Sequence, residues 1–362
     1  MPRLSPALLQ RAIQRSRHLT RLLPVCRDLR SAQNELRWLK AHIETLKLGD
    51  ESGRRGISLT TLIKRRSKGE PLQYILGNQP FGDLDILCKP GVLIPRSDTE
   101  TYVQRIAEAL TQLSRHYVLS GQKLNIFDLC AGTGCISLLL HSRLKPAHSS
   151  AVHPSIQILG VDVSTKALQL ADQNLQHNMR LGHLHQDAVT DIEFQEVDVL
   201  ESPIDRLSLN SGSEINTVIL SNPPYISPTD FAIGGRTAPG VRRFEPRLAL
   251  VPRTTGPAAA IQQEDVFYPK ILEAARKTDA KLVCMEVGDF HQAQRVAALA
   301  TKMLGRDILL EIWCDDGSSY LPLAPNGGIS RGSSGDLDRA VIVWTGSWAT
   351  WRKTRVNHEL TE

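Results

Sequence analysis

The chain has 362 residues, 41% of them hydrophobic, and a formal net charge of +5. A chain of this length can bury a sizeable core, and it predicts two domains or one large domain with an accessory part. It contains no apolar run of about 18 residues, so neither a transmembrane helix nor a membrane partner is expected. The mildly basic balance permits a polyanionic partner such as RNA without requiring one.

The cysteine pattern argues against a metal site and against a disulfide framework. No Cys-x-x-Cys pair and no Cys/His cluster with metal-ligand spacing occurs in the sequence. We therefore expect reduced, mostly buried thiols in an intracellular protein, and no bound metal. The cysteines are Cys26, Cys88, Cys130, Cys135, Cys284 and Cys314.

Residues 1–28 are rich in arginine and contain serine, and Asp28 is the first acidic residue. This composition is typical of a mitochondrial targeting segment and predicts a location in the mitochondrial matrix, with the cytoplasm as the alternative. The same residues could instead form a basic first helix of the next domain. The apolar side of that helix would consist of Leu8, Leu9, Ile13, Leu19, Leu22 and Leu23.

A small helical domain is predicted over residues 29–75. Its main helix carries one apolar stripe, in which the gaps are three, four and three residues. A loop that contains glycine, near 49–56, precedes a second short helix over 58–68. The stripe consists of Leu36, Leu39, Ile43 and Leu46.

Residues 76–100 are a predicted linker with a β-hairpin, because prolines and glycines exclude long helices there. The chain from 101 to 350 is predicted to be one α/β domain, in which strands alternate with helices and form a mostly parallel sheet covered on both faces. No helix separates the last two strands, so we expect them to pair as an antiparallel hairpin at one edge. The predicted strands are 84–87, 124–129, 156–161, 192–197, 217–220, 281–287, 308–313 and 340–344, and the helices are 98–113, 135–144, 166–178, 265–276 and 292–304. Surface loops are predicted at 145–155, 201–214 and 315–336, and a C-terminal tail at 351–362.

A glycine-containing turn lies between the strand at 124–129 and the helix at 135–144. Glycines there let the chain turn sharply and let a ligand approach the backbone, at the strand end where open α/β sheets bind ligands. Ser137 stands where a dinucleotide-binding motif would have its third glycine. A carboxylate before the loop instead suits the amino group of S-adenosylmethionine. The predicted cofactor-binding residues here are Asp128, Cys130, Ala131, Gly132, Thr133 and Gly134.

Two further acidic residues follow the next two predicted strands. Asp162 can accept hydrogen bonds from both ribose hydroxyls, and the predicted loop at 145–155 explains its long distance from the glycines. Asp198 can accept from the exocyclic amine of adenine, while the backbone of Val199 meets the ring edge. An Asp that only caps a helix or a turn is the alternative in both places.

The tetrapeptide Asn222-Pro223-Pro224-Tyr225 follows the strand at 217–220. The prolines fix the backbone and remove two N–H donors, so the Pro223 carbonyl is held rigidly as an acceptor beside the amide oxygen of Asn222. Two fixed acceptors suit one planar NH2 group, and the ring of Tyr225 can pack against it. Methyl transfer from a sulfonium depends mainly on such positioning, which predicts catalytic roles for Asn222, Pro223 and Tyr225 and substrate binding by all four residues.

The motifs and their surroundings resemble the HemK/PrmC family, the protein-(glutamine-N5) methyltransferases that modify class 1 peptide chain release factors. The similarity runs from about residue 30 to 345. One departure is Cys130-Ala131, which replaces a commoner Gly-Thr pair. Beyond the tetrapeptide, the matching segments are 34–39 (NELRWL), 69–77 (GEPLQYILG), 92–100 (VLIPRSDTE), 244–250 (FEPRLAL) and 286–288 (EVG).

The resemblance implies a Rossmann-like class I methyltransferase domain, with a seven-stranded sheet of order 3-2-1-4-5-7-6 and a helical N-terminal domain. It implies that residues 130–134, Asp162, Val199 and Asn222 contact S-adenosylmethionine, and that residues 222–225 hold the glutamine of a Gly-Gly-Gln motif. The partner would be a peptide chain release factor, in support of translation termination near the ribosome. The basic leader favours a mitochondrial member.

Two other functions remain open at this point. A nucleic-acid amino methyltransferase could use the same tetrapeptide on adenine N6 or guanine N2, but it would need a target-recognition domain with a strong basic patch. The extra domain here is small and the net charge modest, so direct DNA binding is not expected. A non-catalytic binding protein is the other alternative, and the intact glycine loop, Asp162 and the tetrapeptide argue against it.

Overall fold

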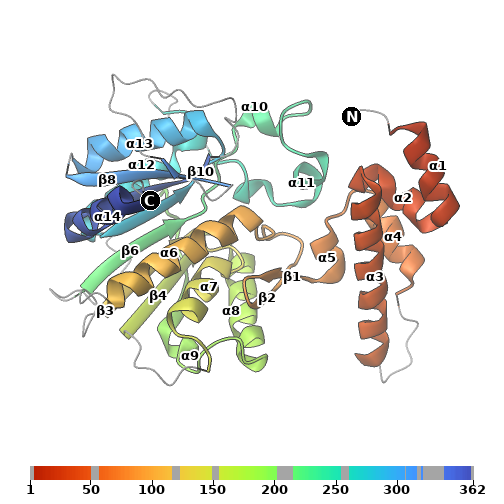
Figure 1. The fold of residues 1–362 in the computed structure, drawn as a ribbon, viewed down its shortest axis with the longest axis horizontal. Coiled ribbons are helices and arrows are strands. Elements are labelled where there is room, and N and C mark those ends of the chain that lie inside the picture. Colours follow the sequence, from red (N-terminus) through yellow and green to blue (C-terminus); the bar gives the residue numbers. More distant parts are fainter. Residues whose placement is uncertain are drawn as a thin grey trace. The chain divides into compact units, whose positions relative to one another are not determined.

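The computed structural model describes residues 4–49, 57–115, 123–148, 155–201, 215–253, 261–305, 307–315, 319–320 and 338–359. The chain divides into two compact units, which are described one at a time (Figure 1). The smaller consists of Met1–Gln79, Cys88–Pro90 and Thr237–Glu245, and the larger of Pro80–Leu87, Gly91–Arg236 and Pro246–Glu362. Most of the three predicted surface loops, and the loop near 49–56, lie outside the described residues.

The smaller unit is helical, as predicted, and residues 1–28 contribute two helices to it rather than one. Ser16 ends the first helix and caps the second, since its hydroxyl accepts from the backbone N–H of His18 at 3.2 Å. Because the chain turns there, Ile13 is 64% exposed and not part of an apolar side. The helices are α1 (Pro6–Arg15), α2 (Arg17–Cys26), α3 (Leu29–Gly49), α4 (Leu59–Ser67), α5 (Leu72–Leu76) and α11 (Pro239–Phe244).

One hydrophobic core joins α1 to α5. Three residues of the predicted stripe on α3 are buried in it, whereas the fourth, Leu46, lies near the end of the helix and is 40% exposed. Two arginines of α4 fasten the unit: Arg66 pairs with Glu35 at 2.7 Å, and Arg65 with Glu70 at 2.6 Å. The core residues are Ala12, Leu19, Leu22, Leu23, Ala32, Leu36, Leu39, Ile43, Leu62, Ile63, Leu72 and Ile75.

The predicted hairpin in the linker is confirmed as β1 (Asn78–Phe81) and β2 (Leu84–Leu87). Two asparagines of α8 (Thr165–Arg180) attach β2 to the larger unit. The amide oxygen of Asn178 accepts the backbone N–H of Asp85 at 2.9 Å, and that of Asn174 accepts the N–H of Leu87 at 2.7 Å. These bonds satisfy backbone donors that the two-stranded sheet leaves unpaired.

The larger unit is built on a mostly parallel sheet of order β5-β4-β3-β6-β7-β10-β8-β9. Its first seven strands follow the predicted order 3-2-1-4-5-7-6. The predicted antiparallel pair is β8 with β10, and β10 also pairs with β7. A two-residue strand, β9, adds to the edge within the predicted loop at 315–336. The strands are β3 (Lys123–Leu129), β4 (Ser155–Asp162), β5 (Ile192–Glu196), β6 (Ile215–Ser221), β7 (Leu282–Glu286), β8 (Ile308–Cys314), β9 (Ser319–Tyr320) and β10 (Asp338–Thr345).

Helices cover both faces of the sheet, because alternate strand residues point to opposite sides. Leu124 and Ile126 of β3 join the core beneath α6, α7 and α14, and Phe127 and Leu129 join the core beneath α12 and α13. Figure 1 shows the two helical layers on either side of the sheet. The helices are α6 (Ser97–Arg115), α7 (Cys135–Leu144), α9 (Ala188–Asp191), α10 (Pro228–Phe231), α12 (Phe267–Lys277), α13 (Phe290–Leu304) and α14 (Gly346–Glu359). No helix in the described ranges is long and apolar enough to cross a membrane.

Two segments differ from the prediction. Lys145, predicted to begin a surface loop, is buried and ends α7, and its ammonium contacts Asp187 and Asp191 at 3.2 and 2.7 Å. The predicted C-terminal tail is largely the helix α14. Trp348 of α14 is fully buried, and Arg352 forms a buried ion pair with Glu311.

Replacing Arg352 with methionine will destabilise the larger unit by about 3–5 kcal/mol, because it leaves the carboxylate of Glu311 buried without its cation. The indole N–H of Trp344, 2.7 Å from that carboxylate, is too weak a substitute. Thermal unfolding followed by near-ultraviolet circular dichroism measures the effect. Lys353→Met, an exposed neighbour on the same helix, is the matched control and should unfold like the unchanged protein. Equal stability of the two variants would contradict the assignment of α14 to the core.

Candidate active site

The predicted site residues converge at the carboxyl ends of β3, β4, β5 and β6. A hollow of about 770 Å³, which includes its solvent-open mouth, lies there within the larger unit. Its wall is apolar apart from two carboxylates, an arginine, an amide and a serine. The residues around it are Gly91, Val92, Leu93, Cys130, Gly132, Asp162, Val163, Ser164, Ala167, Val197, Asp198, Val199, Asn222, Pro224, Pro246, Leu248, Ala249, Arg253 and Phe267.

The turn after β3 brings its backbone to this pocket. Gly132 and Gly134 take φ values of +56° and +76°, which side chains disfavour. Cys130 takes φ of +69° in spite of its side chain, and burial raises the pKa of its thiol. A Cβ on Gly134 would lie 2.8 Å from the ring of Phe194, so this glycine also lets β5 pack against the turn.

Asp128 stabilises the turn through hydrogen bonds to Ser137 on α7, and it is not among the residues that line the pocket. Its Oδ2 accepts from the hydroxyl and the backbone N–H of Ser137, at 2.7 and 3.2 Å. Burial raises its pKa to about 6, against the effect of these hydrogen bonds. Its Oδ1 is buried without a hydrogen-bond partner among the described residues.

Asp162 lines the pocket at the end of β4 and also organises the loops around it. Its Oδ2 accepts the N–H of Gly132 at 3.0 Å, and its Oδ1 accepts the N–H of Ser164 at 2.8 Å. Burial raises its pKa although the backbone hydrogen bonds oppose this. Each carboxylate oxygen can accept a second hydrogen bond, so this capping leaves room for two ligand hydroxyls.

Asp198 follows β5 and also lines the pocket. Its Oδ1 accepts the N–H of Leu200 at 3.0 Å, and its Oδ2 accepts from Arg253 at 2.5 Å. Val199 lies beside it in the wall. Asp198 is therefore an acceptor whose negative charge is already compensated by a cation.

The tetrapeptide follows β6, where Asn222 and Pro224 line the pocket and Pro223 and Tyr225 do not. Ser221 fixes the strand end, since its hydroxyl donates to the carbonyl of Leu129 on β3 at 2.8 Å. The side-chain nitrogen Nδ2 of Asn222 donates to the hydroxyl of Thr99 at 3.2 Å. The rigid tetrapeptide thus begins in the lining of the pocket.

Tyr225 is held in place from three directions. Its hydroxyl donates to Oε1 of the buried Glu286 at 3.1 Å, and its backbone carbonyl accepts from Gln292 at 3.3 Å. Gly288 lies against its ring, where a Cβ would come within 3.1 Å. Gln292 is buried, and its side chain also accepts the backbone N–H of Gly288 at 2.8 Å and donates to Asp265 at 2.9 Å.

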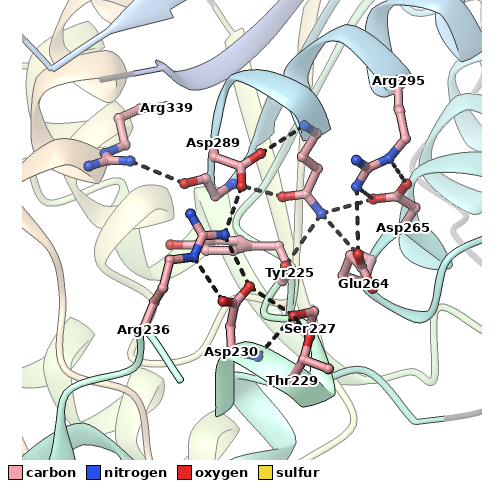
Figure 2. Close-up of polar contacts among 12 residues, drawn as sticks. Tyr225, Ser227, Thr229, Asp230, Arg236, Glu264, Asp265, Asp289, Arg295 and Arg339 are labelled. Atoms are coloured by element: carbon pink, nitrogen blue, oxygen red, sulfur yellow. Dashed lines mark hydrogen bonds and ion pairs between the residues drawn. The ribbon is translucent and has the colours of Figure 1, made fainter. Parts of the chain in front are cut away.

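An ion-pair cluster holds the chain that follows the tetrapeptide (Figure 2). Arg236 contacts Asp230 on α10 and Asp289 at the start of α13, both at 2.8 Å. Ser227 caps α10 and also donates to Asp230 at 2.8 Å. Hydrogen bonding to Arg236 lowers the pKa of Asp230. The loop is thereby tied to the start of α13, the helix that also carries Gln292, a contact of Tyr225.

The structure brings together most, but not all, of the predicted site residues. Ala131, Thr133 and Gly134 shape the turn without lining the pocket, as Asp128 does. Several other residues also line it. Val92 and Leu93 belong to the segment 92–100, which resembles the loop that borders the family's active site, and Pro246, Leu248 and Ala249 belong to the matching segment 244–250. Arg253 and Phe267 carry no local signal in the sequence, because only the fold brings them there. In the described part of the chain, no group of three His, Cys, Asp or Glu residues is placed to hold a metal.

The pocket fits S-adenosylmethionine by its chemistry. A nucleoside has a flat apolar ring and several donors, namely two ribose hydroxyls and an exocyclic amine. Apolar walls from Val163, Val199 and Phe267 match the ring, and the carboxylates of Asp162 and Asp198 match the donors. Asn222 lines the same pocket.

No family model matches the chain. It is 35% identical over 292 residues to the probable MRF1 mitochondrial N(5)-glutamine methyltransferase mtq1 of Schizosaccharomyces pombe, covering 77% of this chain and 84% of the relative. It is 38% identical over 254 residues to the mitochondrial MRF1 N(5)-glutamine methyltransferase MTQ1 of Saccharomyces cerevisiae, covering 69% and 68%. A release factor glutamine methyltransferase of Thermodesulfovibrio yellowstonii is 31% identical over 67% of this chain and 72% of its own length. On this similarity, the chain belongs to the family of release factor glutamine methyltransferases.

Proposed function

We propose that this protein transfers a methyl group from S-adenosylmethionine to the side-chain nitrogen N5 of a glutamine, in the Gly-Gly-Gln motif of a class 1 peptide chain release factor. The observation that carries the proposal is the position of Asn222. It lines the same pocket as Asp162 and Asp198, so an acceptor held by the tetrapeptide would meet a donor held by the carboxylates.

The tetrapeptide positions the acceptor nitrogen. Oδ1 of Asn222 and the carbonyl of Pro223 each accept one N–H of the glutamine amide, and Tyr225 packs against its plane. S-Adenosylmethionine supplies an electrophilic methyl group on a sulfonium. The amide nitrogen forms a bond to the methyl carbon while the carbon–sulfur bond breaks, and the electron pair of that bond stays on sulfur. One N–H proton is then transferred to water. Both acceptors stabilise the positive charge that grows on nitrogen.

A glutamine is favoured over a nucleobase as the acceptor. The three relatives described above are named as glutamine methyltransferases. The second unit here is a small helical one, which suits a protein partner better than a DNA target-recognition domain.

We also propose a mitochondrial location for the protein. The support is the acid-poor, arginine-rich segment 1–28 and the mitochondrial relatives in two yeasts. Leu22 and Leu23 of α2 are fully buried in the helical core, so removal of the whole segment would expose that core. We therefore propose that the targeting signal is recognised without a cleavage that removes α2.

Replacing Asn222 with alanine will lower kcat about 10²–10³-fold, the loss expected for one preorganised polar contact to the reacting group. Affinity for S-adenosylmethionine should stay within a few fold. Mass spectrometry of the glutamine-containing peptide of a mitochondrial release factor, incubated with labelled donor, provides the rate. Label on duplex DNA and none on the glutamine would contradict the proposed substrate.

Replacing Asp162 with asparagine will weaken donor binding about 10- to 100-fold, because a hydrogen bond to a charged group contributes about 1.5–3 kcal/mol. Calorimetric titration with S-adenosylhomocysteine reports the dissociation constant. Asp172→Asn changes an exposed carboxylate on α8 and should bind normally. Unchanged binding of S-adenosylhomocysteine by the Asp162 variant would show that this carboxylate accepts only backbone N–H groups and does not contact the ligand.

Protein recovered from mitochondria should retain residues 17–26. Its N-terminal peptide, identified by mass spectrometry, is the measurement. A mature chain that begins after Cys26 yet unfolds at the same temperature as the full chain would contradict the proposal. Recovery only from the cytosol would contradict the location itself.

A further inference from the structure

Thr99 and Glu286 lie behind the tetrapeptide and connect its two functional side chains. Thr99 is on α6 and Glu286 ends β7, and both side chains are buried. The hydroxyl of Thr99 donates to Oε2 of Glu286 at 2.6 Å, and Oε1 of the same carboxylate accepts from Tyr225 at 3.1 Å. Asn222 completes the chain through its bond to Thr99. Neither Thr99 nor Glu286 lines the donor pocket.

The direction of these hydrogen bonds is set by the protons available. Each oxygen of Glu286 accepts from a hydroxyl, as expected of an ionised carboxylate, which can only accept, and a hydroxyl has only one proton. The proton of Thr99 lies in the short bond to Glu286, so its oxygen can only accept from Asn222. The group of Asn222 that faces Thr99 must then be the NH2, and its carbonyl oxygen Oδ1 is left for the substrate.

The opposite orientation of the Asn222 amide would be unproductive. Its two ends have nearly the same shape, so steric packing alone distinguishes them poorly. With the amide reversed, an NH2 group would face the NH2 of the glutamine, and two donors would meet. An acceptor site for an amide therefore needs something behind it that accepts hydrogen bonds and does not donate.

We propose that Glu286, acting through Thr99, is the positioning residue that sets the orientation of the Asn222 amide, so that Oδ1 is presented to the substrate nitrogen. The same carboxylate orders the hydroxyl of Tyr225 and thereby its ring. One buried carboxylate thus aligns both side chains of the tetrapeptide. The proposal rests on the proposed function for the identity of the substrate, but the orientation itself is a property of this chain alone.

The buried position of Glu286 is consistent with this role. A carboxylate without water needs several donors, and here they come from two different segments, α6 and the tetrapeptide. The hydroxyl of Tyr268 on α12 donates to the backbone carbonyl of Glu286 at 3.0 Å and holds the strand end. The carboxylate is therefore fixed by its backbone as well as by its partners.

Two nearly isosteric substitutions test the proposal. Thr99→Val removes the hydroxyl. Glu286→Gln replaces one carboxylate oxygen with an NH2 group, which can donate and so reverse the direction of the hydrogen bonds to Thr99 and Asn222. Each should lower kcat for glutamine methylation about 10- to 100-fold, as expected when a reacting group is poorly positioned. The dissociation constant for S-adenosylhomocysteine should remain within about twofold, because neither residue lines that pocket. Thr99→Ser restores the hydroxyl and should restore most of the activity.

The matched control is Thr101→Val. Thr101 is on the same helix, and its hydroxyl donates to the carbonyl of Ser97 at 3.1 Å, away from the tetrapeptide. This variant should keep normal kcat. A loss of kcat in Thr101→Val as large as that in Thr99→Val would contradict the proposal, because it would show that removing any threonine from α6 disturbs the site.

A double mutant separates positioning from a general structural role. If Thr99 acts through Asn222, adding Thr99→Val to Asn222→Ala should cost little more than Asn222→Ala alone. If the factors by which the two single substitutions lower kcat multiply in the double mutant, the proposal is overturned.

A magnetic resonance measurement tests the orientation without any substrate. With asparagine labelled by ¹⁵N, the side-chain NH2 signals of Asn222 are identified by their absence in Asn222→Ala. They should shift strongly in Thr99→Val and Glu286→Gln and not in Thr101→Val. Unshifted signals would refute the orientation even if methylation is confirmed, whereas the expected shifts without methylation would refute only the proposed function.

Discussion

The parallel pairing of β3 with strands on both sides is the constraint on which the rest of the site depends. Leu129, the last residue of β3, lies opposite Val161 of β4 and Ser221 of β6. Because parallel strands in register end at the same level, Cys130, Asp162 and Asn222 all follow at one edge of the sheet. Residues about 30 and 90 positions apart in sequence are thereby brought around one pocket. A slip of one residue in either pairing would turn these side chains toward opposite faces.

Three carboxylates lie in or near the wall of the pocket, and each accepts hydrogen bonds from different donors. Asp128 accepts from Ser137, Asp162 from backbone N–H groups, and Glu286 from Thr99 and Tyr225. Burial raises the pKa of all three, and the hydrogen bonds oppose that effect. Removing carboxylates from water is unfavourable, so their donors are as much a part of the site as the charges. Two of these carboxylates, Asp128 and Glu286, support the site without lining the pocket.

The tetrapeptide combines a rigid backbone with side chains whose orientation comes from elsewhere. The prolines restrict the chain by their own covalent structure and need no neighbours. Asn222 and Tyr225 can rotate, and their positions depend on Thr99, Glu286, Gly288 and Gln292. The ion pairs of Arg236 extend this support to the following loop. The positions of both side chains therefore depend on residues of α6, β7 and α13.

The amino-acid sequence by itself determined the alternation of strands and helices along the chain, the glycine turn, the acidic residues after β4 and β5, and the tetrapeptide, whereas the order of the strands in the sheet came from the resemblance to the family. Each is a local pattern: a period of two or 3.6, a breaker, or a motif at the end of a strand. Long-range contacts have no such pattern. Only the tertiary structure brings Arg253 and Phe267 to the pocket. It also makes α14 part of the core through Trp348 and Arg352, and it packs the two helices of residues 1–28 into a shared core. The direction of the hydrogen bonds from Asn222 to Thr99 and on to Glu286 was likewise decided by tertiary structure, since it depends on which donors and acceptors meet across more than a hundred residues.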